Sequence, residues 1–333
     1  MIFVVGNSRS GTTMLSRILG NNKKVHTFQE IHFLESIISP DDLNTVFSNE
    51  RALHLLNKLF AIQKQSFFKQ HQISQYSNES KLVLLKIASD KITPANVFSS
   101  FLDYYSGLYG KELACEQTPK NVYYLNEINL NISNTLFINM VRDPRSIMLS
   151  QKNKWKRKFL GLTDLPLYET LRSWSLYHPF TVSTIWKSSV EQCLSYNGDN
   201  LLSVKFEDLI LNPKSTVINI CDFLSLEYSD SMLAIPQVGS SIGADSKSLG
   251  VNPEKLSTWE NSSLTDTEIY ICEKLNGNLM GELGYELSNV KPNYFMLALF
   301  IFSFPFKISL SILLNLSRMK NIKATLIKRL GIK

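Results

Sequence analysis

The first twenty residues contain the feature that most restricts the fold. Residues 2–5 are a β-branched and aromatic run, and residues 13–19 have the pattern of a helix. A strand, a glycine-containing turn and a helix in this order predict the opening of a βαβ unit. The turn is Gly6-Asn7-Ser8-Arg9-Ser10-Gly11-Thr12-Thr13, which has the glycine spacing of the phosphate-binding loop GxxxxGK[ST].

This loop has the chemistry of an anion site. Backbone N–H groups and the helix N-terminus favour an anion, and Arg9 supplies a cation from within the loop. We therefore expect a phosphate to bind at Arg9, Ser10, Gly11, Thr12 and Thr13. Thr12 stands where the loop usually has lysine, and this substitution disfavours hydrolysis of ATP or GTP, which uses that lysine on the β- and γ-phosphates.

Further strands and helices alternate along the chain. Residues 136–141 and 201–206 have the apolar character of buried parallel strands, and a helix is predicted over residues 215–224. Helical periodicity fills the stretch between the first two strands, including residues 51–72 and 97–108. The pattern predicts an α/β fold of the P-loop-like, three-layer type, with a central parallel sheet and helical insertions.

A second motif follows the second predicted strand. Arg142-Asp143-Pro144-Arg145 opens a helix, so Arg142 would lie at the carboxyl end of the strand, where open parallel sheets bind ligands. Ser150 comes eight residues later, two helical turns on. Together Arg142 and Ser150 could hold one phosphate between them.

These motifs resemble those of the sulfotransferases that use 3′-phosphoadenosine 5′-phosphosulfate, especially the branch containing protein-tyrosine and many bacterial enzymes. The resemblance implies that Arg9 to Thr13 bind the 5′-phosphosulfate, and that Arg142 and Ser150 bind the 3′-phosphate. It covers residues 1–290 and includes segments 204–209, 256–259 and 283–285. It also implies that the protein transfers a sulfuryl group from this donor to an acceptor hydroxyl.

The resemblance places the catalytic base at Glu30, after the first helix. A carboxylate there can accept the hydroxyl proton, and Arg9 would stabilise the departing phosphate. His32 is a competing base, and Glu35 is expected at the surface. We expect no metal, because no His, Cys or carboxylate group has ligand spacing.

The sequence departs from the family pattern at two positions. Gln117 and Thr258 stand where the family often has basic residues, and each change removes a cation from the expected site. Lys120 or Lys247 could substitute. In a glycine-flanked stretch over residues 239–250, Ser246 or Ser248 could close over the donor.

Two other functions stay open at this point. A small-molecule kinase could use the same loop, but it would need a Mg²⁺-binding acid after a strand, and the sequence offers no clear one. Alternatively, a membrane-attached protein could hold the nucleotide without turnover, since Gln117 and Thr258 lack the expected charge.

The net charge of +6 is concentrated in two clusters. The first predicts a phosphorylated ligand and the second an anionic membrane surface, although either could be a solvated helix face. The first cluster is Lys152, Lys154, Lys156, Arg157 and Lys158, and the second is Arg318, Lys320, Lys323, Lys328, Arg329 and Lys333.

The second cluster ends an apolar C-terminal segment, residues 291–333. Residues 294–306 and 308–316 are largely apolar, with Lys307 between them and Pro305 close by. We expect this segment to lie in or dip into the inner leaflet, held by its basic tail. The alternative is a helical hairpin packed on the catalytic domain, residues 1–290.

The cellular compartment and the binding partners are inferred from less specific features of the sequence than the two motifs. The four cysteines lie far apart and are expected to be free thiols in a reducing compartment. Residues 1–6 do not resemble a signal peptide, so we expect a cytoplasmic protein, peripheral on the inner face of the membrane. The expected acceptor is a hydroxyl of a glycan, lipid or peptide, and no nucleic acid is expected.

Overall fold

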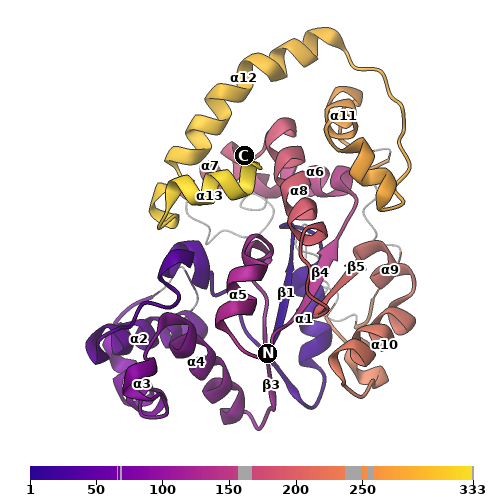
Figure 1. Ribbon diagram of the computed structural model, residues 1–333. Coiled ribbons are helices and arrows are strands. Elements are labelled where there is room, and N and C mark those ends of the chain that lie inside the picture. The colour runs from indigo at the N-terminus through magenta and orange to yellow at the C-terminus, as the bar shows by residue number, and fades with distance from the viewer. Residues whose placement is uncertain are drawn as a thin grey trace.

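Five parallel strands form the centre of the molecule (Figure 1). The computed structural model describes residues 1–65, 67, 70–156, 167–236, 249–251, 253, 259–260 and 262–331. The strands are β1 (Ile2–Gly6), β2 (Val25–Thr27), β3 (Leu113–Glu116), β4 (Leu136–Val141) and β5 (Leu201–Lys205), in the order β2-β3-β1-β4-β5. All neighbouring strands pair in parallel, so the predicted α/β fold with a central parallel sheet is confirmed.

Helices cover both faces of the sheet. In chain order the α-helices are α1 (Thr12–Gly20), α2 (Asn49–Gln65), α3 (Ser77–Leu84), α4 (Pro94–Leu108), α5 (Leu125–Asn131), α6 (Pro144–Lys152), α7 (Leu167–Ser175), α8 (Pro179–Leu194), α9 (Phe206–Leu211), α10 (Pro213–Leu224), α11 (Asp266–Glu282), α12 (Tyr294–Leu313) and α13 (Ile322–Leu330). Short turns of other helix types include η1 (Phe33–Ile37), η2 (Pro40–Asp42), η3 (Ile73–Tyr76), η4 (Ser89–Lys91), η5 (Pro119–Tyr124), η7 (Asp230–Leu233) and η9 (Leu316–Arg318).

The middle strand separates two hydrophobic cores. All five residues of β1 are buried, as expected of a parallel strand covered on both faces. Because side chains alternate along a strand, Phe3 and Val5 enter the core formed with α2 and α4, whereas Ile2 and Val4 enter the core formed with α1 and α10. The resulting three-layer packing is the arrangement predicted for the sequence.

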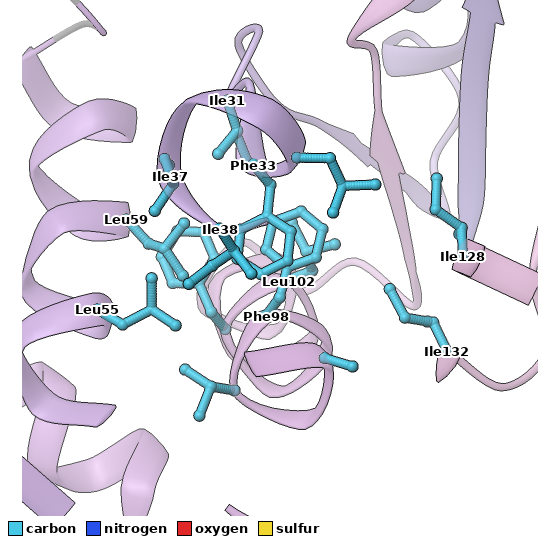
Figure 2. Packing of buried hydrophobic residues seen from close by; sticks show 14 of the residues in the cluster. Ile31, Phe33, Ile37, Ile38, Leu55, Leu59, Phe98, Leu102, Ile128 and Ile132 are labelled. Carbon is cyan, nitrogen blue, oxygen red and sulfur yellow. The ribbon is translucent and has the colours of Figure 1, made fainter. Parts of the chain in front are cut away.

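Figure 2 shows the first of these cores where α2, α4 and η1 meet. The rings of Phe33 and Phe98 stack with centroids 4.0 Å apart and planes 4° from parallel. Leu55 and Leu59 from α2 and Leu102 from α4 are buried in the same cluster. This packing fixes residues 28–38, the segment that follows β2 and includes Glu30.

Two strands lie in the stretch for which only helical periodicity was predicted. β2 has three residues and β3 has four, too few to produce a clear alternating pattern. Helix α2 also ends at Gln65 rather than continuing to residue 72. The sequence identified β1, β4 and β5 because those strands have five or six residues each.

The C-terminal segment forms one long helix followed by a short one. α12 is one helix that continues through Pro305, and it arches away from the body, whereas α13 returns to pack against α8 (Figure 1). Among the described helices, α12 is the one long and apolar enough to cross a membrane, with mean hydropathy 2.0 and 6% of that window buried. The tail after it is therefore docked on the protein body.

Candidate functional site

The loop between β1 and α1 is held by two glycines with positive φ. Gly6 has φ 135°, and a Cβ there would collide with the carbonyl oxygen of Met140 on β4. Gly11 has φ 96°, and a Cβ there would collide with the ring of Phe206. Both positions therefore exclude side chains on steric grounds as well as by backbone conformation.

The side chains of the loop differ in burial and in their contacts. Ser10 is buried and donates its hydroxyl to the carbonyl of Asn7 at 2.6 Å, so this side chain closes the loop. Thr12 is buried, whereas Thr13 is exposed. The first N–H groups of α1 have no acceptor within the helix, so the loop offers an anion backbone donors at Gly11, Thr12 and Thr13.

The two predicted phosphate motifs come together in space. Arg9 Nε donates to the hydroxyl of Ser150 on α6 at 2.8 Å. Arg142, at the end of β4, donates through Nη1 to the carbonyl of Arg9 at 3.1 Å. Its guanidinium also lies over the Phe206 ring, 4.2 Å from the centroid. The structure thus brings Arg9, Arg142 and Ser150 together, with Arg9 between the other two.

Arg145 stabilises the turn that follows Arg142. Its guanidinium is buried and donates to Asp143 at 3.0 and 2.7 Å and to Glu273 at 2.7 Å. It also lies 3.9 Å from the ring centroid of Trp259. The Asp143 carboxylate in turn caps α6 by accepting from the Arg145 backbone N–H. The second arginine of the motif is therefore a scaffold residue, which the sequence motif alone did not reveal.

Glu30 lies on the other side of the loop, with 40% of its side chain exposed. Burial raises the pKa of Glu30, while Lys154, Lys120 and Arg9 act in the opposite direction. His32 Nε2 is 3.4 Å from a Glu30 oxygen. Burial lowers the pKa of His32 to about 3, so the imidazole is neutral near pH 7 and does not form an ion pair with Glu30.

A cavity of about 360 Å³ connects these elements. Its lining includes the loop residues Gly6, Asn7 and Ser8 together with Glu30 and His32. Further lining residues are Ser36, Phe67, Lys120, Tyr123, Gln151, Lys154, Trp155, Glu169, Thr170, Arg172, Ser173, Leu176, Val182, Ile185, Asn315, Arg318 and Arg329. The cavity therefore extends from the phosphate loop past the predicted base to the C-terminal segment.

The turn after β3 contains Gln117, one of the two departures from the family pattern, and Lys120, one of the two residues that could substitute for a missing cation. The Glu116 carboxylate accepts from the backbone N–H of Thr118 at 3.1 Å and from Asn121 at 2.7 Å, which fixes this turn. Gln117 lies beside the loop, where its side-chain oxygen accepts from the Thr13 hydroxyl at 3.4 Å. Lys120 lines the cavity that contains Glu30. A cation from the same turn is thus present at the site although residue 117 is neutral.

Glu35 corrects one expectation from the sequence. It was expected at the surface, but only 1% of it is exposed. Its carboxylate pairs with Arg329 of α13 and accepts from the Tyr124 hydroxyl at 2.9 Å. Glu35 therefore anchors the C-terminal tail, a role that no local pattern indicates because its partner lies 294 residues away.

The two basic clusters also need correction, because several of their members pair with carboxylates of the body. Lys152 contacts Glu268 at 2.7 Å, so it points toward α11. In the tail, Arg318 pairs with Glu169 and Lys328 pairs with Glu127. Lys154 lines the cavity and Lys156, Lys320 and Lys323 are exposed. The described members of each cluster therefore do not form a single charged face.

Some predicted residues lie outside the part of the chain that the structure describes. They are Arg157, Lys158, Ser246, Lys247, Ser248, Thr258 and Lys333. Among the expected free thiols, all four are described, and all are buried and unpaired with one another.

Comparison with known proteins places the chain in a family. The profile described as "Sulfotransferase family" matches residues 2–230. Protein-tyrosine sulfotransferase 2 of Gallus gallus is 21% identical over 88% of this chain and 67% of its own length. A Caenorhabditis briggsae protein named as a protein-tyrosine sulfotransferase is 26% identical over 55% of this chain and 64% of its own length. The aligned regions thus span about two thirds of these relatives.

A solved structure shares the fold. The sulfotransferase domain from the Synechococcus PCC 7002 olefin synthase superposes with a TM-score of 0.50 over 84% of this chain and 94% of that domain, at 16% identity. This likeness shows that the fold of the chain is one already known from a solved structure.

Proposed function

The chain belongs to the sulfotransferase family, and on that basis we propose that it transfers a sulfuryl group from 3′-phosphoadenosine 5′-phosphosulfate to an acceptor hydroxyl. The observation that carries this proposal is the meeting of Arg9, Arg142 and Ser150 beside a cavity that contains Glu30. Two anion-binding elements on one side and a carboxylate on the other suit a donor with two phosphate groups and an acceptor with a proton to lose.

In this proposal the first motif binds the 5′-phosphosulfate. The N-terminus of α1 offers its backbone donors and dipole to the anion. The Ser10 hydroxyl acts through the loop, which it holds closed, rather than through direct contact. Arg142 and Ser150 bind the 3′-phosphate, and Arg9 turns from Ser150 toward the phosphosulfate when the donor is bound.

The transfer itself needs one proton acceptor and a set of cations. The acceptor oxygen forms a bond to sulfur while the bond from sulfur to the bridging phosphate oxygen breaks, and that oxygen keeps the electron pair. Glu30 takes the hydroxyl proton, and its raised pKa suits that role at neutral pH. Arg9 stabilises the negative charge that grows on the departing phosphate. No residue in this scheme requires a metal ion.

The acceptor is proposed to be a glycan or lipid hydroxyl presented at a membrane surface. α12 exposes an apolar surface on nearly every side, and the tail after it lines the cavity through Asn315 and Arg318. A protein bound to the inner face of the membrane through α12 would hold the cavity close to lipid-linked acceptors. We propose a cytoplasmic, peripheral location for this reason.

Donor binding gives the first test. We expect calorimetric titration to show tight binding of 3′-phosphoadenosine 5′-phosphate and much weaker binding of ATP. Arg142→Ala should weaken the former by about 2 kcal/mol, because a charge-assisted hydrogen bond is lost. Lys187→Ala is the matched control, since Lys187 is a half-exposed cation on α8 that contacts Glu191 at 3.9 Å. Equal preference for Mg-ATP would support a kinase, and donor binding without transfer to any acceptor would support a non-catalytic binding protein.

A further inference from the structure

The cavity brings together cations from four separate elements. Lys120 comes from η5, Arg172 from α7, Arg318 from η9 and Arg329 from α13, and all four line the cavity. None of them belongs to the two phosphate motifs. Arg318 and Arg329 also lie beyond residue 230, where the family match ends.

These cations share few carboxylates within the described part of the chain. Glu169 contacts Arg172 at 2.8 Å and also pairs with Arg318. Glu35 pairs with Arg329 and lies 3.9 Å from Lys120. Two carboxylates therefore face four cations, because each carboxylate is shared between two of them.

The cations are close enough to affect one another. Burial is the largest cause that lowers the pKa of Lys120 to about 8; the guanidinium groups of Arg172 and Arg318 act in the same direction, and Glu30 opposes them. Burial likewise lowers the pKa of Arg318, with Arg172 acting in the same direction. Like charges held together in a partly desolvated cavity repel strongly, and an anion placed among them would be bound for the same reason.

The cavity also has apolar lining residues. Tyr123, Trp155, Leu176, Val182 and Ile185 all line it. A molecule that fills the cavity would therefore have an apolar or ring-like body as well as a charged group and a reactive hydroxyl.

We propose that the acceptor carries an anionic group, a carboxylate or a phosphate, that binds at Lys120, Arg172 and Arg318 while its hydroxyl faces Glu30. This inference rests on the proposed function and adds the substrate class. It makes Arg318 a specificity-determining residue supplied by the C-terminal segment, so that the tail selects the acceptor as well as lining the cavity.

The test uses the full chain saturated with 3′-phosphoadenosine 5′-phosphate, so that the donor site is already filled. The probes are 4-hydroxyphenylacetate and 4-hydroxybenzylphosphonate, with the neutral 4-hydroxyphenylacetamide as the reference of similar shape. Their affinities are measured by ligand-observed NMR titration for the wild type, Arg318→Gln, Lys120→Gln and Lys323→Gln. Lys323 is an exposed cation on α13 outside the cavity, which makes it the matched control.

We expect the wild type to bind at least one anionic probe about fivefold or more tightly than the amide, the effect of charge-assisted contacts. That preference should fall below twofold in Arg318→Gln and Lys120→Gln and stay unchanged in Lys323→Gln. Whether the carboxylate or the phosphonate is preferred identifies the anion. A melting temperature close to that of the wild type shows that each variant is folded.

Two results would overturn the inference. One is a wild type with no preference for either anionic probe, including no binding of any probe. The other is a preference that persists in both Arg318→Gln and Lys120→Gln. Failure of the proposed function is a separate outcome, because it would appear earlier as absent binding of 3′-phosphoadenosine 5′-phosphate.

Discussion

At the scale of single residues, Glu30 combines two properties that a general base needs. It is partly buried, which raises its pKa, and it faces three cations, which keep its ionised form accessible. His32, the competing base, is neutral near pH 7 but lies against Glu30 and the Phe67 ring, with ring centroids 4.9 Å apart. Both residues line the cavity, but a pKa of about 3 makes the His32 imidazole too weak a base to take the hydroxyl proton, which favours Glu30.

We expect Glu30→Gln to reduce sulfuryl transfer by a factor of about 10² to 10⁴, the usual contribution of a general base. Binding of 3′-phosphoadenosine 5′-phosphate should change little, because the donor cluster of Arg9, Arg142 and Ser150 is intact. Transfer is measured with radiolabelled donor and an acceptor found by screening. His32→Asn is the control, and a greater loss in His32→Asn than in Glu30→Gln would assign the base to His32.

The pH profile of transfer should be bell-shaped. On the acid side, the rate rises as Glu30 loses its proton, and the raised pKa places this limb above the ordinary carboxylate range. On the alkaline side, the rate falls above about pH 8 as Lys120 loses its charge. Lys120→Arg should remove the alkaline fall, because arginine stays charged there. A profile for Lys120→Arg identical to that of the wild type would show that another group causes the fall.

The sequence indicates the donor-side residues much better than the acceptor side. Arg9, Arg142 and Ser150 follow strands in recognisable motifs, and parallel strands bring such residues to one edge of a sheet. The acceptor side depends on contacts between distant segments. Glu35 and Arg329 meet across 294 residues, and nothing near either residue in the sequence indicates the other.

At the scale of elements, the length of a strand determines whether its sequence pattern can be recognised. β1, β4 and β5 were identified because each has five or six residues. β2 and β3 are shorter, and their place in the sheet comes from pairing with each other and with β1. α13 is similar, since its position depends on the ion pairs of Lys328 and Arg329 with the body rather than on its own composition.

The docking of α13 gives a prediction at this scale. Glu35→Gln leaves the Arg329 guanidinium, 19% exposed, without its carboxylate partner. Breaking a buried ion pair is costly, and we expect a loss of about 2 kcal/mol because Arg329 keeps some contact with water. Limited trypsin digestion should cleave the tail faster than in the wild type. Glu112→Gln removes an exposed partner of Lys24 and serves as control. Equal cleavage in the two variants would mean that Glu35 does not hold the tail.

At the scale of the whole molecule, the catalytic body and α12 differ in how much apolar surface they expose. The body buries its apolar residues in three clusters, whereas α12 exposes most of its own, including Phe295, Phe302 and Phe306. Soluble proteins seldom expose a continuous apolar surface of this kind unless something covers it. Since the tail returns from α12 to line the cavity through Asn315 and Arg318, α12 and the cavity are joined by the same short segment.

We expect a lipid bilayer to cover the apolar surface of α12. The protein should therefore co-sediment with vesicles containing anionic lipid. Phe302 and Phe306 are 76% and 81% exposed, and burying a phenylalanine side chain contributes about 1.5–3 kcal/mol. Replacing both with glutamate should therefore weaken vesicle binding by at least about tenfold and leave the binding of 3′-phosphoadenosine 5′-phosphate unchanged. Leu130→Glu is the control, because Leu130 is 82% exposed but lies on α5, in the body. If the double variant binds vesicles as the wild type does, α12 does not contact the bilayer, and its apolar surface must be covered by another protein chain.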